Sequence, residues 1–150
     1  MALTFVHHGH RHVLLNIYAP SDREARERFY AQLPELDDRD VTSIMGGDFN
    51  ATLRSTDRSH NTTRTHGSAA LLRYFDHARL IDAVPHRDPS PAWTCPDIEA
   101  YEDHTFLCST PAGQVRASRL DRWYVSESDQ RRLRGVHVVG PWCRPKKSAK

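Results

Sequence analysis

The sequence has few of the features that mark secreted or membrane proteins. No apolar run approaches the roughly 20 residues of a membrane-spanning helix, and the opening residues, MALTFVHHGHRHVLL, lack the basic-then-apolar layout of a signal peptide. Cysteine is scarce, and Cys95, Cys108 and Cys143 show no CxxC spacing, so no disulfide framework is expected. These absences favour an intracellular location, nuclear or cytoplasmic. They predict no membrane partner, and the sequence defines no protein partner.

Charge is nearly balanced over the 150 residues but is unevenly placed. From Val115 onward there are ten Lys and Arg against three Asp and Glu, a net of +7, whereas residues 1–114 carry 11 and 16. A basic C-terminal quarter suits a polyanionic partner such as nucleic acid. On charge alone, however, a solvated basic surface with a basic tail is the preferred interpretation.

Signals for strands and helices alternate along the chain. Ser21 and Glu24 have capping-box spacing ahead of an apolar stripe, which predicts a helix over 21–33. Ser68 is suited to cap a second helix over 69–80. Strands are expected at 12–20, 41–47, 104–108, 114–118, 119–126 and 135–140, the third and fourth as a hairpin. This order predicts a mixed α/β (α+β) fold built in layers.

The stretch SIMGGDFNATL, residues 43–53, combines an apolar strand, two glycines, and a carboxylate and an amide two positions apart. Gly46 and Gly47 allow a tight bend or a close approach of neighbouring atoms. In extended backbone Asp48 and Asn50 point to one side, while Phe49 points into the core. A carboxylate beside an amide can handle a water or a metal ion together with an oxyanion, although a simple capped turn has the same composition.

The order of several motifs favours the chemical interpretation. LLNIYAP, SIMGGDFNATL, LIDAV and SRLDRWYVS follow one another over about residues 3–140. This series resembles the endonuclease/exonuclease/phosphatase superfamily, and most of all the apurinic-type endonuclease domains of non-LTR retrotransposons. The resemblance implies a four-layer α/β sandwich and divalent-metal-dependent phosphodiester hydrolysis. It implies Mg²⁺ or Mn²⁺ as the cofactor and nucleic acid, with DNA favoured over RNA, as the partner.

The resemblance also implies roles for four residues. Asp48 would position and deprotonate the attacking water, and Asn50 would hold the nucleophile and the scissile phosphate. Tyr18, from the IYAP motif, would reach the phosphate, and Asp121, from SRLDR, would orient a catalytic histidine. Phosphodiester cleavage gathers negative charge around phosphorus, so it needs a Lewis acid, a base and neutral donors.

Two parts of the family pattern have no counterpart in this sequence. They are the N-terminal half, with the glutamate that holds the metal, and the Ser-Asp-His motif expected after Asp121. We therefore expect a partial domain at 1–140 followed by a basic tail at 141–150, with impaired activity. We also expect poor stability, because half of a sandwich exposes an apolar sheet face or a strand edge.

Other residues admit both a functional and a structural interpretation. Arg119, beside Asp121, is the best candidate to bind phosphate, with Arg116 and Arg122 nearby. Trp93, Trp123 and Tyr124 could stack on bases or could belong to the core.

Two possible metal clusters are weaker candidates than these. Strand alternation would place His8, His10 and His12 on one face, but exposed imidazoles of a polar hairpin explain them better. Cys95, His104 and Cys108 match no zinc spacing, and buried thiols are the preferred interpretation.

Two other functions fit the same residues. The chain could be a non-catalytic nucleic-acid-binding remnant, whose affinity would depend on its basic residues and on salt. It could also be a phosphatase of the same superfamily acting on lipids or small phosphoesters, although nothing in the sequence names such a substrate. The metal ligands themselves are not identified by the sequence.

Overall fold

The computed structural model describes residues 1–36, 41–54, 57–59, 67–83 and 104–133. Within these ranges, no helix is long and apolar enough to cross a membrane. Four features named from the sequence, Trp93, Cys95, the strand at 135–140 and the tail at 141–150 with Cys143, lie outside the described residues.

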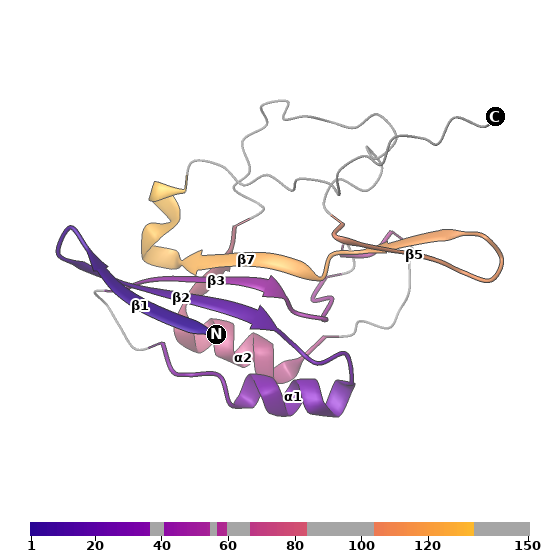
Figure 1. Ribbon diagram of the computed structural model, residues 1–150, viewed down its shortest axis with the longest axis horizontal. Coiled ribbons are helices and arrows are strands. Elements are labelled where there is room, and N and C mark those ends of the chain that lie inside the picture. The colour runs from indigo at the N-terminus through magenta and orange to yellow at the C-terminus, as the bar shows by residue number, and fades with distance from the viewer. Residues whose placement is uncertain (37–40, 55–56, 60–66, 84–103, 134–150) are drawn as a thin grey trace.

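The centre of the fold is a five-stranded sheet (Figure 1). Its strand order is β1-β2-β3-β7-β4, and β2 and β3 form its parallel pair, flanked by antiparallel neighbours. The bounds are Ala2–His7 for β1, His10–Tyr18 for β2, Val41–Asp48 for β3, Leu80–Asp82 for β4 and Asp121–Ser126 for β7. A separate hairpin joins β5 (Phe106–Ser109) to β6 (Val115–Ser118), as predicted.

Two helices cover one face of this sheet, as Figure 1 shows below the strands. The α1 helix spans Arg23–Ala31, and its N-cap is Asp22, whose Oδ1 accepts from the N–H of Ala25 at 2.8 Å. The observed N-cap is therefore one residue later in the chain than Ser21, the predicted cap. The α2 helix spans Ala69–Ala78 and is capped by Ser68, as the sequence predicts. A short 3₁₀ helix, η4 (Glu127–Arg132), follows β7.

The hydrophobic core lies between the sheet and the helices. It is built from alternate residues of β2 and β3, from α2 and from the loop after β3. Phe49 is fully buried, as predicted, and its ring lies 5.4 Å from that of Tyr124, which stacks on Phe75 at 4.0 Å. The residue after Asp48 therefore anchors the end of β3 in the core.

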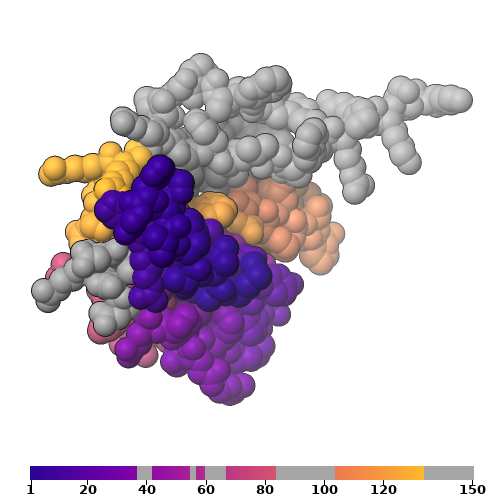
Figure 2. All heavy atoms as spheres, turned by 60° about the vertical axis from the view of Figure 1, so that its left-hand side comes forward, coloured from indigo at the N-terminus to yellow at the C-terminus, as the bar shows by residue number. Residues whose placement is uncertain are grey.

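The opposite face of the sheet carries exposed apolar side chains. Leu3 is 51% exposed, Phe5 39% and Trp123 56%. Figure 2 shows the β1–β2 hairpin, coloured indigo, standing at the surface. The described residues thus supply one sheet layer and one helix layer, in line with an α+β fold and with the expectation of an apolar sheet face left exposed.

One detail of the sequence interpretation is confirmed and one is corrected. A turn at His8 and Gly9, both with positive φ, joins β1 to β2, and His7, His8 and His10 are exposed, as the preferred interpretation of a polar hairpin predicts. No group of three or more metal-ligating residues is present among the described residues. Cys108, expected to be a buried thiol, is exposed, because it lies on the small β5–β6 hairpin, outside the main core.

Burial of tyrosines predicts that the fold is sensitive to alkali. Burial raises the pKa of Tyr74 and of Tyr124 from 10.0 to about 12, and it raises that of Tyr30 further. Above pH 10 the unfolded chain loses these protons while the folded chain keeps them. The free energy of unfolding should therefore be at its full value below pH 10 and fall as the pH rises towards 12. Urea titrations by circular dichroism, with tyrosinate absorbance followed in parallel, test this; constant stability up to pH 12 would contradict it.

Candidate active site at the end of the central strands

Two glycines shape the end of β3. A Cβ atom on Gly46 would lie 2.4 Å from the ring of Trp123, which occupies that space. Gly47 has a φ of +129°, and a Cβ there would lie 2.1 Å from the carbonyl oxygen of Ile17. The paired glycines therefore allow Trp123 and β2 to approach the strand that delivers Asp48.

Three of the residues named from the sequence form a row across the sheet. The parallel register pairs Tyr18 with Asp48, and the antiparallel register pairs Asp48 with Asp121. Figure 1 shows why, since β2 and β3 end, and β7 begins, at the same end of the sheet. Paired residues point to the same face, so this row lies on the face opposite the helices, where Tyr18 is 81% exposed.

The two carboxylates of the row are close neighbours. The N–H of Phe49 donates to the carbonyl of Leu120 at 2.9 Å, which makes the adjacent Asp48–Asp121 position a non-hydrogen-bonded pair. Side chains at such positions have Cβ atoms about 4.5–5.5 Å apart. Among the described residues, neither carboxylate has a cationic partner. The pair therefore concentrates negative charge at one point on the surface.

Asn50 is fixed against Asp48 by its backbone and its side chain. It adopts a left-handed conformation, with a φ of 47°, which asparagine tolerates better than most residues. Its N–H donates to Oδ1 of Asp48 at 2.8 Å, and its Nδ2 donates to the carbonyl of Ala19 at 2.8 Å. Asn50 therefore ties the ends of β2 and β3 together, with its Nδ2 turned to the protein.

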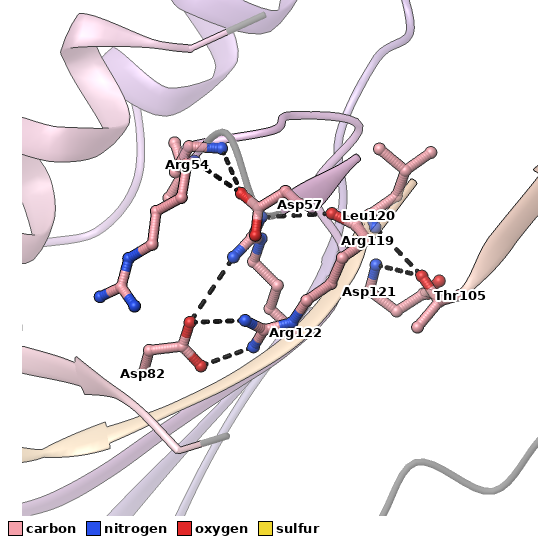
Figure 3. A network of polar contacts seen from close by, with 9 residues as sticks. Arg54, Asp57, Asp82, Thr105, Arg119, Leu120, Asp121 and Arg122 are labelled. Atoms are coloured by element: carbon pink, nitrogen blue, oxygen red, sulfur yellow. Dashed lines mark hydrogen bonds and ion pairs between the residues drawn. The ribbon is translucent and has the colours of Figure 1, made fainter. Parts of the chain in front are cut away.

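The start of β7 is fixed by a hydroxyl from outside the sheet. Thr105 Oγ1 accepts from the N–H of Leu120 at 3.0 Å and from the N–H of Asp121 at 2.9 Å (Figure 3). These contacts set the position of Asp121 independently of its carboxylate. The carboxylate stays free for other contacts, and the residue is exposed.

The chemistry of this donor set suits a hard divalent cation. Mg²⁺ prefers oxygen ligands and keeps several waters, so it is commonly bound through only one or two carboxylates. Asp48 and Asp121 supply two carboxylates from adjacent strands, and the N–H of Asn50 holds Oδ1 of Asp48 in place. The residues fit a partly hydrated Mg²⁺ or Mn²⁺ better than a fully coordinated structural metal.

Arg119 lies elsewhere than expected for a phosphate ligand. The residue is 6% exposed, and its side chain forms a two-pronged ion pair with Asp82, at 2.9 and 2.6 Å. Phosphate binding by Arg119 stays a prediction and would require this pair to open. Tyr124 belongs to the core and cannot stack on bases, whereas Trp123 is exposed on the same face as Asp121.

Sequence reasoning missed the buried polar network behind this row. Arg122 is 2% exposed and forms ion pairs with Asp57 and with Asp82 (Figure 3). Asp57 Oδ2 also accepts from the backbone N–H groups of Leu53 and Arg54, at 2.6 and 2.7 Å. The only sequence signal was an aspartate inside the apolar LIDAV segment, because a charge there needs a partner. The network clamps the loop after Asn50 to β7.

One curated protein matches a large part of the chain. It is the "Transposon TX1 uncharacterized 149 kDa protein" of Xenopus laevis, which is 32% identical over 122 residues. The match covers 79% of this chain but only 8% of that protein, so the chain spans a small part of the relative's length. No family model matches the chain. The similarity thus connects this sequence with a transposon protein.

Proposed function

We propose that the chain is part of a divalent-metal-dependent phosphodiesterase. It would be an endonuclease of the retrotransposon type that hydrolyses nucleic acid, with DNA as the favoured substrate. The observation that carries the proposal is the row of Tyr18, Asp48 and Asp121 on three adjacent strands, with Asn50 bonded to Asp48. Similarity to a transposon protein supports the assignment to a retrotransposon-type protein. The wider four-layer sandwich belongs to this proposal, with a second sheet expected on the exposed face.

Each residue has a role that its position supports. Asp48, with its Oδ1 held by the N–H of Asn50, orients the attacking water and takes its proton. The exposed Tyr18 hydroxyl donates to a phosphate oxygen. A bound Mg²⁺ would supply Lewis-acid stabilisation of the charge that develops on the phosphate. Asp121 adds a carboxylate oxygen beside Asp48 and gives an imidazole a partner to orient it.

Nicking of supercoiled plasmid is the direct test, because one cut per molecule changes its mobility and slow turnover is still visible. We expect nicking in magnesium that EDTA abolishes. The Asp48→Ala variant should lose this activity and keep its affinity for DNA. Metal-independent cleavage, or equal cleavage by the variant, would contradict the proposal.

A nucleic-acid-binding remnant is the second candidate, and exposed Trp123 beside the row favours it. It differs in what Asp48 does. A binder without catalysis shows no nicking, binds DNA with a steep salt dependence, and keeps or gains affinity when Asp48 becomes alanine. Plasmid nicking by the unmodified chain and by Asp48→Ala therefore separates the candidates. Filter binding of DNA by the same two proteins shows whether affinity is kept.

A further inference from the structure

The peptide group between Phe49 and Asn50 has a hydrogen bond on each of its two polar atoms. Its N–H donates to Oδ1 of Asp48 at 2.8 Å, the contact that holds the carboxylate of the candidate site. Its carbonyl oxygen accepts from the hydroxyl of Tyr30, which lies on α1. Because a peptide group is planar, the direction of its carbonyl also sets the direction of its N–H. One rigid unit therefore joins Tyr30 to Asp48.

The bond from Tyr30 is buried and keeps its proton. Tyr30 is 2% exposed and Phe49 is fully buried, so water does not compete for the carbonyl. Burial raises the pKa of Tyr30 above its ordinary value of 10.0, and the negative charge of Asp48 acts in the same direction. The hydroxyl therefore stays protonated, and stays a donor, across the pH range in which a nuclease is assayed.

The backbone at Asn50 needs such a contact to keep its conformation. The φ of Asn50 is 47°, in the left-handed region that L residues adopt only rarely. A flip of the Phe49–Asn50 peptide would return Asn50 to a negative φ. The same flip would turn the N–H away from Asp48 and the carbonyl away from Tyr30. The Tyr30 hydroxyl therefore opposes the flip and keeps the N–H on the carboxylate.

The helix that carries Tyr30 is itself anchored beside the site. The chain passes from β2 into α1 through a short connection (Figure 1). Arg26, one turn before Tyr30, is 3% exposed, and its Nη1 donates to the carbonyl of Ser21 at 2.8 Å. In the same connection, the N–H of Ala19 donates to the carbonyl of Asp48 at 2.9 Å. These contacts hold the start of α1 against the ends of β2 and β3.

From these contacts we infer that Tyr30 is a positioning residue of the candidate site, acting on Asp48 through the Phe49–Asn50 peptide. Donation to the carbonyl also polarises the peptide and strengthens its N–H as a donor. Oδ1 of Asp48 is thereby held to the protein. Oδ2 lies 3.4 Å from Nδ2 of Asn50, a long contact that leaves it able to receive the water or the metal ion. The effect on hydrolysis rests on the proposed function, whereas the effect on the Asn50 N–H does not.

The chain offers a matched control, because a second tyrosine makes the same kind of bond. Tyr74 lies on α2, and its hydroxyl donates to the carbonyl of Pro34 at 2.9 Å. Tyr30→Phe and Tyr74→Phe each remove one hydroxyl and keep the ring. Both should fold, and both should lower the melting temperature by about 2–6 °C. A general loss of stability is therefore the same in the two variants.

The deciding measurement is hydrogen exchange at the Asn50 N–H, followed by nuclear magnetic resonance of the full chain. We expect exchange about tenfold faster in Tyr30→Phe, because the peptide is then able to turn its N–H away from Asp48. Exchange at this position should be unchanged in Tyr74→Phe. Plasmid nicking at saturating magnesium and DNA should also fall about tenfold in Tyr30→Phe, with KM for the plasmid unchanged, and should be kept in Tyr74→Phe.

Three results would overturn the inference. The first is equal exchange at Asn50 in Tyr30→Phe and the unmodified chain, which would show that the peptide is held without Tyr30. The second is the same acceleration in both variants, which would indicate a general loss of stability. The third is faster exchange at Asn50 with unchanged nicking, which would show that the position of this N–H does not affect hydrolysis.

Two further outcomes are separated by the same design. An unmodified chain that does not nick DNA would count against the proposed function, while exchange at Asn50 still decides whether Tyr30 positions Asp48. If Tyr30→Phe does not fold, the unmodified chain provides the test. A hydroxyl that donates to a buried carbonyl exchanges slowly enough to give a resolved proton resonance, and the absence of that resonance for Tyr30 would contradict the inference.

Discussion

Replacing Gly47 by alanine is expected to cost more than about 3 kcal/mol of the free energy of unfolding. The Cβ atom would lie 2.1 Å from the carbonyl oxygen of Ile17, a backbone atom that cannot turn aside, and the φ of +129° is strained for any L side chain. Relief requires β2 and β3 to separate where they position Tyr18 and Asp48. Urea unfolding of both proteins by circular dichroism measures the loss.

A second glycine separates the two causes of this effect. Gly9 has a φ of +76°, but a Cβ there would meet nothing within 4 Å. Gly9→Ala should therefore cost only the conformational penalty of about 1–2 kcal/mol. Equal losses for the two variants would show that the contact with Ile17 is relieved easily and that the close approach of the strands is not what Gly47 provides.

Replacing Asp57 by alanine is expected to destabilise the fold by about 3–5 kcal/mol, a large part of the roughly 5–15 kcal/mol that stabilises a typical domain. The change removes one of the two carboxylates that pair with Arg122, which is 2% exposed, and leaves Asp82 to pair with both Arg119 and Arg122. It also leaves the N–H groups of Leu53 and Arg54 without their acceptor. Chemical denaturation gives the loss directly.

Two further variants distinguish burial from charge. Asp129 pairs with Arg132 at 2.9 Å near the surface, and Asp129→Ala should cost no more than about 1 kcal/mol. Adding Arg122→Met to Asp57→Ala should restore part of the lost stability, because the uncompensated buried charge is then gone. A double variant less stable than Asp57→Ala would show that Arg122 stabilises the fold through contacts other than this ion pair.

The local elements of this fold follow from local signals in the sequence. Ser68 before an apolar stripe predicted α2, and the turn residues after Ser109 predicted the β5–β6 hairpin. The first helix was placed correctly, but its cap was assigned to Ser21 instead of Asp22. Both residues are good caps, and their choice depends on the entry angle of the chain after β2, which the sequence does not specify.

The sequence could predict that the candidate site residues lie together only as far as strand register can be inferred. The GDFN motif indicated that Asp48 and Asn50 act together, and they are bonded in the structure. The pairing of Tyr18 and Asp121 with Asp48 depends on strand order, since Asp121 is far along the chain and reaches β3 only through the topology.

The buried ion pairs were hidden for the same reason. Arg119 contacts Asp82, 37 positions away, and Arg122 contacts Asp57, 65 positions away. Nothing in the spacing of charged residues marks such partners, and arginine beside a motif aspartate is a reasonable phosphate ligand on sequence grounds. The fold adds what the sequence does not show, which is that both arginines are buried and paired with carboxylates.

The most direct test of the central claim compares plasmid nicking by the unmodified chain and by Asp48→Asn in magnesium. Asparagine keeps the size of the side chain and the acceptor for the N–H of Asn50, so the fold should be retained while the base is lost. The account predicts a fall in nicking rate of about 100-fold or more, with unchanged thermal melting. Nicking no different between the two folded proteins would contradict the assignment of Asp48 and, with it, the proposed active site.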